Sequence, residues 1–467
     1  MLQRLALLSC LISAPILAGS PALDWKALRP EILQHYLGVL SIDTSNPPGN
    51  ETLAVNYLRS VLDAEGVPYE TFALTPERGN LVVRIKGNGS RRPLLFMGHT
   101  DVVTTQRDKW ASDPFKPLRK DGFVYARGSN DDKDSVTAGL TLVLLLHRRH
   151  VKLDRDVIFL AEAGEEGTST YGIDFMVKQH WDAIDAEYAL AEGGGGVVRQ
   201  GKLLAVTVST TEKSPRPTLL RATGTAGHGS IPRLDNPIAH VAAAVAKVAA
   251  HQPPMRLNDT TRAYFEKLAT ISDPQHADRY NHISDPARSA GIQSYLARWE
   301  PQLYSMLRTS VVPTILNAGF RTNVIPSTAE ATLDVRALPD ENMNNLYAYL
   351  RSVIDDPEVE VIAVQKDVRP TSPPSPLDSE MFKTLESVQQ RMYPSAITLP
   401  TMLTGATDNA QLRHKGVKAY GIGPWTDEED GGLGAAHTEN ERLREEYLYQ
   451  FIQYLWTVVT QMAASPN

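Results

Sequence analysis

A short apolar run that ends in a histidine constrains this chain more than any other feature. Residues 94–97 are wholly apolar, and Gly98, His99, Thr100 and Asp101 follow them. A run of this length that is bounded by glycine is typical of a buried strand in a parallel sheet. His99 is therefore expected at the carboxyl end of a central strand, where open α/β sheets bind their ligands. Asp101 lies within reach of the imidazole, and a carboxylate on the outer nitrogen orients a metal-bound histidine.

Predicted strands and helices alternate along the first part of the chain. The pattern predicts helices over 24–42, 51–65 and 135–147, and strands over 69–74, 80–86, 156–161 and 187–191. Such alternation indicates an α/β fold, with a mostly parallel sheet that has helices on both faces.

The pattern changes at two proline-containing junctions, 213–217 and 371–376. Between them it predicts a small α/β sandwich with an antiparallel sheet, interrupted by a longer, polar, helical insertion over 259–307. Beyond them it predicts a strand over 417–422 and a helix over 441–462. We therefore divide the chain into four parts, namely a signal peptide (1–22), a catalytic domain in two pieces (23–212 and 371–467) and an inserted lid or dimerisation domain (213–370).

The first 22 residues have the composition of a secretory signal peptide. Arg4 is the only charged residue before Asp24, and residues 5–17 form an apolar run that small residues follow. This run is too short to span a bilayer. A secreted or periplasmic protein is the favoured interpretation. The alternatives are a buried N-terminal helix and a lipid anchor on Cys10.

Composition excludes two classes of chemistry. Cys10 is the only cysteine among the 467 residues, so removal of the signal peptide leaves no thiol to serve as nucleophile or metal ligand. The net charge of −7 provides no basic surface for nucleic acid. Any metal must be held by histidines and carboxylates.

Acidic residues and histidines recur in turns near predicted strand ends. Besides His99 they are Asp131, Glu165, Glu166, Glu192 and His437. Any one of them alone is more simply explained as a solvated surface residue. Together, two histidines and three carboxylates can hold two divalent ions if one carboxylate bridges them. Nitrogen and oxygen ligands suit zinc, with cobalt or manganese as substitutes.

The order of these motifs resembles that of the zinc metallopeptidase family of aminoacylase, carboxypeptidase G, acetylornithine deacetylase and succinyl-diaminopimelate desuccinylase. The resemblance runs from about residue 32 to 443. Its motifs, in order, are 46–49 (NPPG), His99 with Asp101, Trp110 with 113–115, 127–128, 165–166, 227–228, 323–326, 334–336, 405–408 and 437–441.

The resemblance implies a role for each metal-site residue. Asp131 bridges two zinc ions, His99 and Glu192 complete one site, and Glu166 and His437 complete the other. Asp101 orients His99. The resemblance also implies a cis peptide bond between Asp131 and Asp132.

Two further roles follow from the same resemblance. Glu165 is the general base that takes a proton from water and passes it to the leaving amine. His228 stabilises the oxyanion, often from a partner subunit, which makes a homodimer through the inserted domain one alternative. The long 259–307 insertion is the reason to keep a monomer open, because an enlarged lid can supply this group within one chain.

The resulting functional prediction is a di-zinc hydrolase that cleaves the amide bond of peptides with a free carboxylate. An N-acyl-amino-acid deacylase on the same site is the alternative, and an inactive peptide-binding protein on this fold is the alternative from another class. The residues expected to hold the substrate carboxylate are Asn323, Arg336, Gly405 and Thr407. Arg336 is equally well explained as a structural ion-pair partner at a strand end.

Overall fold

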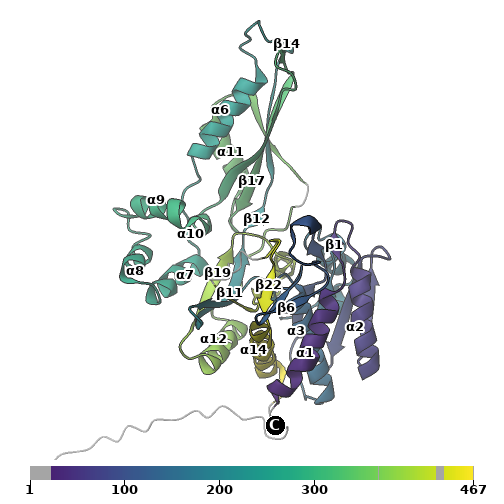
Figure 1. Cartoon of the computed structure of the whole chain (residues 1–467). Helices are drawn as coiled ribbons and strands as arrows, with labels where there is room; N and C mark the ends of the chain where they lie inside the picture. The colour runs from purple at the N-terminus through teal and green to yellow at the C-terminus, as the bar shows by residue number, and fades with distance from the viewer. Residues whose placement is uncertain (1–22, 366–367, 428–435, 466–467) are drawn as a thin grey trace, which may run out of the picture.

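The computed structural model describes residues 23–365, 368–427 and 436–465, and a ten-stranded mixed sheet forms its base (Figure 1). Its strands, in spatial order, are β2 (Tyr69–Ala73), β3 (Gly79–Ile85), β8 (Val157–Glu162), β4 (Leu94–His99), β9 (Tyr188–Ala191), β20 (Lys418–Gly421), β11 (Lys202–Glu212), β10 (Gly195–Arg199) and β21 (Trp425–Asp427), with β19 (Ile397–Leu403) paired to β11. The central strands β8, β4, β9 and β20 are mutually parallel, as expected. The β10–β11 hairpin is antiparallel and was not predicted.

Helices cover both faces of this sheet, which confirms the predicted α/β class. One face packs against α1 (Trp25–Leu40), α2 (Glu51–Glu65), α3 (Lys133–Arg148), α12 (Glu380–Met392) and α14 (Glu445–Ala463). The other face packs against the shorter helices α4 (Ile173–Gln179), α5 (Trp181–Ile184) and α13 (Asn409–His414). The α3 helix is buried from Lys133 to Leu146 because it lies between the sheet and the outer helices. That position explains its nearly continuous apolar sequence.

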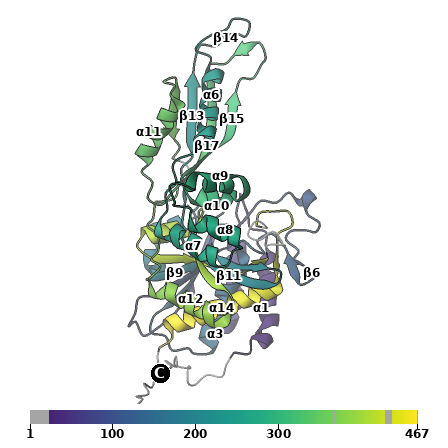
Figure 2. The ribbon, with the colours of Figure 1, turned by 90° about the vertical axis from the view of Figure 1, so that its left-hand side faces the viewer.

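A second sheet is built from residues 214–363, beginning within the first proline-containing junction and ending before the second. It is antiparallel and contains β12 (Ser214–Pro215), β13 (Thr218–Thr223), β15 (Ser310–Ala318), β17 (Thr328–Ala337) and β18 (Val359–Ala363), with α6 (Pro237–Ala250) and α11 (Met343–Ile354) packed on it. A small two-stranded sheet of β14 (Gly227–His228) and β16 (Val324–Ile325) lies at its far end, away from the main sheet in both views (Figure 1 and Figure 2). The α/β sandwich is therefore present. The proposed domain boundaries stay a prediction.

The insertion over 259–307 is helical, as the sequence predicted. It forms α7 (Asp259–Thr270), α8 (Pro274–Asn281), α9 (Ser289–Trp299) and α10 (Pro301–Met306), which share a small core of their own. The α7 helix packs against β19 of the main sheet, so the insertion lies beside the catalytic part and not at the tip of the second sheet.

Short elements hold the loops around the carboxyl ends of the central strands. β1 (Ser45–Asn46) pairs with β5 (Val102–Val103), and β6 (Leu118–Lys120), β7 (Phe123–Tyr125) and β22 (Arg442–Arg444) form a three-stranded sheet. A 3₁₀ turn, η1 (Arg107–Lys109), follows β5. The β22–β7 pairing brings the chain after residue 436 beside the loop that precedes α3.

The first 22 residues lie outside the described part of the chain, and so do the predicted signal peptide and Cys10. Among the helices of residues 23–365, 368–427 and 436–465, none combines the length and apolarity that crossing a membrane requires.

Candidate metal centre

The carboxyl ends of three neighbouring parallel strands gather the first group of acidic and histidine side chains. His99 is the last residue of β4, as predicted. Glu192 directly follows β9, and Glu165 and Glu166 lie in the turn after β8. Because β4 pairs with β8 on one side and β9 on the other, these residues share one edge of the sheet.

Asp131 and His437 reach this edge from loops outside the sheet. Asp131 lies in the turn before α3, and its peptide bond to Asp132 is cis, as the resemblance implied. The Asp132 carboxylate accepts a hydrogen bond from the backbone N–H of His99 at 3.1 Å. The loop before α3 is thereby attached to the end of β4.

A buried ion pair joins the loop of Asp131 to the loop of His437. The Arg127 guanidinium pairs with Glu441, and both side chains are almost fully buried. Arg127 also donates to the His437 carbonyl, and Glu441 accepts from the backbone N–H of Asn130. The pair therefore holds both loops in one arrangement. Sequence analysis included Arg127 and Glu441 only as parts of the matched motifs.

The Asp131 carboxylate lies between two groups of potential ligands. Its Oδ1 atom is 3.1 Å from His99 Nε2, and its Oδ2 atom is 3.0 Å from His437 Nε2. His437 Nε2 also lies 2.9 Å from Glu166 Oε1. Potential ligand atoms of His99, Asp131 and Glu192, and separately those of Asp131, Glu166 and His437, lie within 4.8 Å of one another. Only Asp131 belongs to both groups.

The electrostatics of this cluster favour added positive charge. Burial raises the pKa of Glu192 well above its ordinary value, and the neighbouring carboxyls of Glu165 and Asp131 raise it further. Hydrogen bonds to Asp131 and Glu166 raise the pKa of His437 to about 10. Protons on the histidines thus offset part of the crowded negative charge. Divalent cations would displace those protons and would offset the negative charge more completely. The donor set therefore fits the predicted metals.

Asp101 acts on a wider region than its motif suggested. His99 Nδ1 is closer to the backbone carbonyl of Asp101, at 3.0 Å, than to its carboxylate, at 3.5 Å. The carboxylate accepts hydrogen bonds from the Asn46 amide and from three backbone N–H groups, those of Gly164, Glu165 and Glu166. Asp101 therefore positions the loop of the expected base as well as the His99 ring.

Arg369 is the functional residue that sequence reasoning missed. Its Nη2 atom lies 2.6 Å from Glu165 Oε1, and its Nη1 atom pairs with Asp408. Burial raises the pKa of Glu165 to about 8, although the Arg369 charge opposes this shift. The only sequence signal for Arg369 was its position just before the second proline-containing junction, which served merely as a domain boundary.

His228 and Asn323 lie together, but not at the metal centre of the same chain. His228 pairs in register with Val324 in the two-stranded β14–β16 sheet, and the Gly229 N–H donates to the Asn323 carbonyl at 2.9 Å. Both side chains are exposed at the far end of the second sheet (Figure 2). The helical insertion packs against β19 of the main sheet, and the single-chain and dimer alternatives for His228 both stay predictions.

The other expected carboxylate-binding residues fall in two places. Arg336 Nε is 2.8 Å from Asp334 Oδ1 on β17, which matches the structural alternative for this arginine. Gly405 and Thr407 line the same cavity as Glu192. The Thr407 hydroxyl and the Thr407 backbone N–H both donate to Glu212, at 2.8 Å and 3.0 Å, so only the neighbouring residues of this turn remain for substrate contact.

Comparison with known proteins agrees with this geometry. The model of peptidase family M20/M25/M40 matches residues 95–461. A probable carboxypeptidase S-like 2 of Dictyostelium discoideum is 28% identical over 392 residues, covering 81% of this chain and 74% of that protein. An N-fatty-acyl-amino acid synthase/hydrolase of Homo sapiens is 28% identical over 328 residues, covering 68% of this chain and 64% of that protein.

Solved structures share the fold across nearly the whole chain. An M20 family metallo-carboxypeptidase from Sulfolobus solfataricus superimposes with a TM-score of 0.68 at 18% identity, covering 92% of this chain and 98% of that one. Human carnosine dipeptidase 1 gives a TM-score of 0.63 at 15% identity, covering 93% and 96%. With most of its length matched by the family model, this chain belongs to the M20/M25/M40 family of peptidases and is a metallopeptidase-type hydrolase of amide bonds.

Proposed function

We propose that this hydrolase binds two zinc ions and cleaves the amide bond of peptides that carry a free carboxylate next to that bond. The observation that carries the proposal is the Asp131 carboxylate, which directs one oxygen to His99 and the other to His437. A carboxylate in that position can bridge two cations. Cobalt and manganese are the expected substitutes for zinc at such nitrogen and oxygen ligands.

The chain's own residues then divide the chemistry between them. When bound, the cations supply a Lewis acid for the scissile carbonyl and lower the pKa of water. Glu165 accepts a proton from the attacking water and gives it to the leaving amine nitrogen. Asp101 fixes the Glu165 backbone, and Arg369 holds the Glu165 carboxylate, so the base is already oriented before substrate binds.

The second candidate function is deacylation of N-acyl amino acids. Such substrates present the same amide and the same free carboxylate, so the site would act on them by the same steps. The relatives named N-fatty-acyl-amino acid synthase/hydrolase support this candidate about as well as the carboxypeptidase-like relative supports the first.

Amidation of the substrate carboxylate is expected to abolish efficient cleavage. A panel of dipeptides and N-acyl amino acids is assayed with metal supplied, and the best substrate is compared with its C-terminal amide. Loss of a charge-assisted contact at Asn323, Arg336 or the 405–407 turn should lower kcat/KM by about tenfold to a hundredfold. Equal cleavage of acid and amide would contradict the anchor and favour an aminopeptidase-like activity.

A homodimer through the second sheet would bring His228 to a metal centre. β15 pairs only with β17 among the described strands, so its other edge is open. Exposed apolar side chains follow that edge, including Ile315 (51% exposed), Leu316 (55%) and Phe320 (82%). Open edges and clustered apolar side chains are features of protein–protein contacts. A second copy bound at this edge would provide another chain whose metal centre His228 and Asn323 would approach.

Replacement of His228 is expected to lower turnover without changing metal content. In the shared-site arrangement, His228→Ala lacks an oxyanion donor but keeps every expected ligand. Mixing His228→Ala with Glu165→Gln should restore part of the activity, because a mixed dimer contains one site with both intact groups. Failure of the mixture to recover activity, with both variants dimeric by light scattering, would exclude sharing.

The secreted or periplasmic location, with a lipid anchor on Cys10 as its alternative, also stays a proposal. It rests on the composition of residues 1–22 alone.

A further inference from the structure

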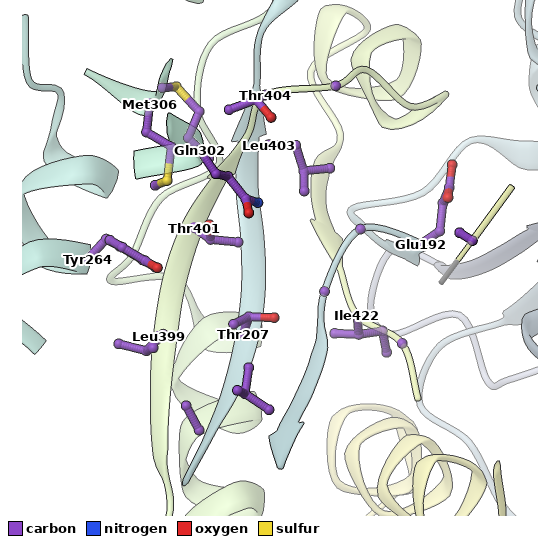
Figure 3. A pocket seen from close by; sticks show the side chains of 18 of the residues that line it. Glu192, Thr207, Tyr264, Gln302, Met306, Leu399, Thr401, Leu403, Thr404 and Ile422 are labelled. Carbon is purple, nitrogen blue, oxygen red and sulfur yellow. The ribbon is translucent and has the colours of Figure 1, made fainter. Parts of the chain in front are cut away.

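A deep cavity leads from the candidate metal centre to the helical insertion (Figure 3). Its volume is about 600 Å³, within the usual range for small-molecule sites. Asp131 and Glu192 line one end, and Tyr264 and Leu268 of α7 line the other. The cavity is therefore continuous with the place where the scissile amide would lie.

The floor of the cavity is the surface of the main sheet. Thr207 on β11 is in register with Gly195 on β10 and Leu399 on β19, so the floor crosses three strands. Neighbouring strands are about 4.8 Å apart, which makes this floor about 10 Å wide. Gly193 lets the chain after β9 pass close to Leu403 in the cavity wall, because a Cβ there would lie 2.7 Å from Leu403 Cδ1. The glycine run after Glu192 thus has a spatial role that its sequence did not indicate.

The far wall is one face of the insertion. Tyr264 and Leu268 recur at helical spacing on α7, Ile271 directly follows that helix, and Leu303 and Met306 lie on α10. Figure 3 shows Tyr264 and Met306 beside β19, across the sheet from Glu192. These side chains add apolar surface to the cavity from a segment that the sequence predicted only as a polar insertion.

Charge decides which half of an amide substrate suits this cavity. Carboxyl groups are concentrated at the metal end, where Asp132 and Asp134 join the expected ligands. Among the described lining residues the only cation is Arg199, which is exposed. A substrate carboxylate would meet no buried cation here, whereas an apolar chain would leave water and contact apolar side chains.

We propose that this cavity holds the acyl chain of N-acyl amino acids, and that the α7–α10 insertion makes long, unbranched acyl chains the preferred ones. The proposal rests on the proposed amide hydrolase function and selects its deacylase branch. The acyl carbon lies at the metal end, the chain extends over Thr207 and Leu399, and the amino-acid carboxylate lies outside the cavity. This placement assigns the 405–407 turn to the acyl side and leaves Asn323 and Arg336 as the residues expected to hold the carboxylate.

The first test is a chain-length series on the metal-loaded protein. Acetyl, hexanoyl, decanoyl and myristoyl derivatives of one amino acid are compared by kcat/KM. Each methylene that leaves water contributes up to about fourfold, so decanoyl should exceed acetyl by at least about tenfold. Binding of the myristoyl derivative to metal-free protein, measured by calorimetry, should show a negative heat-capacity change.

The second test fills the cavity with a matched control. Thr401 on β19 lines the cavity and is half-buried, whereas Thr270 on α7 is exposed and does not line it. Thr401→Phe should lose the long-chain preference and keep its acetyl turnover, which also shows that the variant is folded. Thr270→Phe should behave as the unmodified chain. Leu268→Gln, which makes the far wall polar, provides a second cavity variant.

Three outcomes separate the claims. A flat chain-length series, or preference for dipeptides over every acyl derivative, would overturn the acyl-chain proposal and leave the amide hydrolase standing. Equal long-chain losses in Thr401→Phe and Thr270→Phe would also overturn it. If the metal-loaded chain hydrolyses no amide with a free carboxylate, the proposed function fails, and this inference fails with it.

Discussion

Asp131→Ala is expected to remove both metal ions together with the activity. Asp131 is the one residue shared by the two ligand groups, and its oxygens face His99 and His437 separately. Changes to residues outside the first ligand shell already cost about 10-fold to 100-fold in metal affinity or activity, so loss of a shared ligand should exceed that range. Metal content after dialysis and hydrolysis of the best substrate are the two measurements.

Single-site ligands provide the comparison for this prediction. His99→Ala and His437→Ala should each weaken one site most, so Asp131→Ala should retain less metal than either. Asp182→Ala changes the same residue type at an exposed position of α5 and should retain full metal and activity. Two ions per chain in dialysed Asp131→Ala, or full activity in chelator-treated unmodified protein, would contradict the bridging role.

Sequence analysis correctly predicted those elements of the fold that a single local pattern of residues identifies. The apolar run before His99 is a central strand because both of its faces are buried, and burial on both faces requires continuous apolar residues. The same logic located β8 and β9 and placed Glu192 at a strand end. Because parallel neighbouring strands end at one edge, the gathering of their terminal residues followed from topology alone.

The parts that the sequence did not predict depend on contacts between distant segments. The β10–β11 hairpin begins within a run of glycines, which read locally as a turn, and pairing with neighbouring strands is what extends it. Arg369 becomes a partner of Glu165 only through the path of the chain between the two sheets. The insertion has a polar sequence overall, yet its α7 face contributes to an apolar cavity because α7 packs beside β19.

His228 illustrates the same limit for a site residue. Its Gly-His pair follows a strand of the inserted sheet, as expected, but it forms the short strand β14 and not a turn. Sequence distance gave no information on which metal centre it would approach. The structure separates the β14–β16 tip from the cluster of the same chain (Figure 1). The position of this residue relative to the cluster depends on the arrangement of whole elements, which a local sequence pattern does not contain.

Glu165→Gln is expected to separate metal binding from chemistry. Glu165 belongs to neither ligand group, so the variant should keep its metals. Glutamine has nearly the same size and cannot accept the proton, so kcat should fall by about 10² to 10⁴, the usual contribution of a general base. Folding should be preserved, because glutamine keeps the size of the buried side chain and its amide oxygen can still accept from Arg369. Arg369 would retain Asp408 as its partner.

The neighbouring residue supplies the matched control. Glu166 lies one position further along the same turn, its Oε1 contacts His437, and it belongs to the second ligand group. Glu166→Gln makes the same chemical change and should lose metal from that site. Metal content and kcat are measured for both variants. If Glu165→Gln loses metal and Glu166→Gln keeps it, Glu165 is the metal ligand and Glu166 is the general base, the reverse of this assignment. The pair is informative because the Asp101 carboxylate holds both backbone N–H groups, so neither substitution removes the support of the turn.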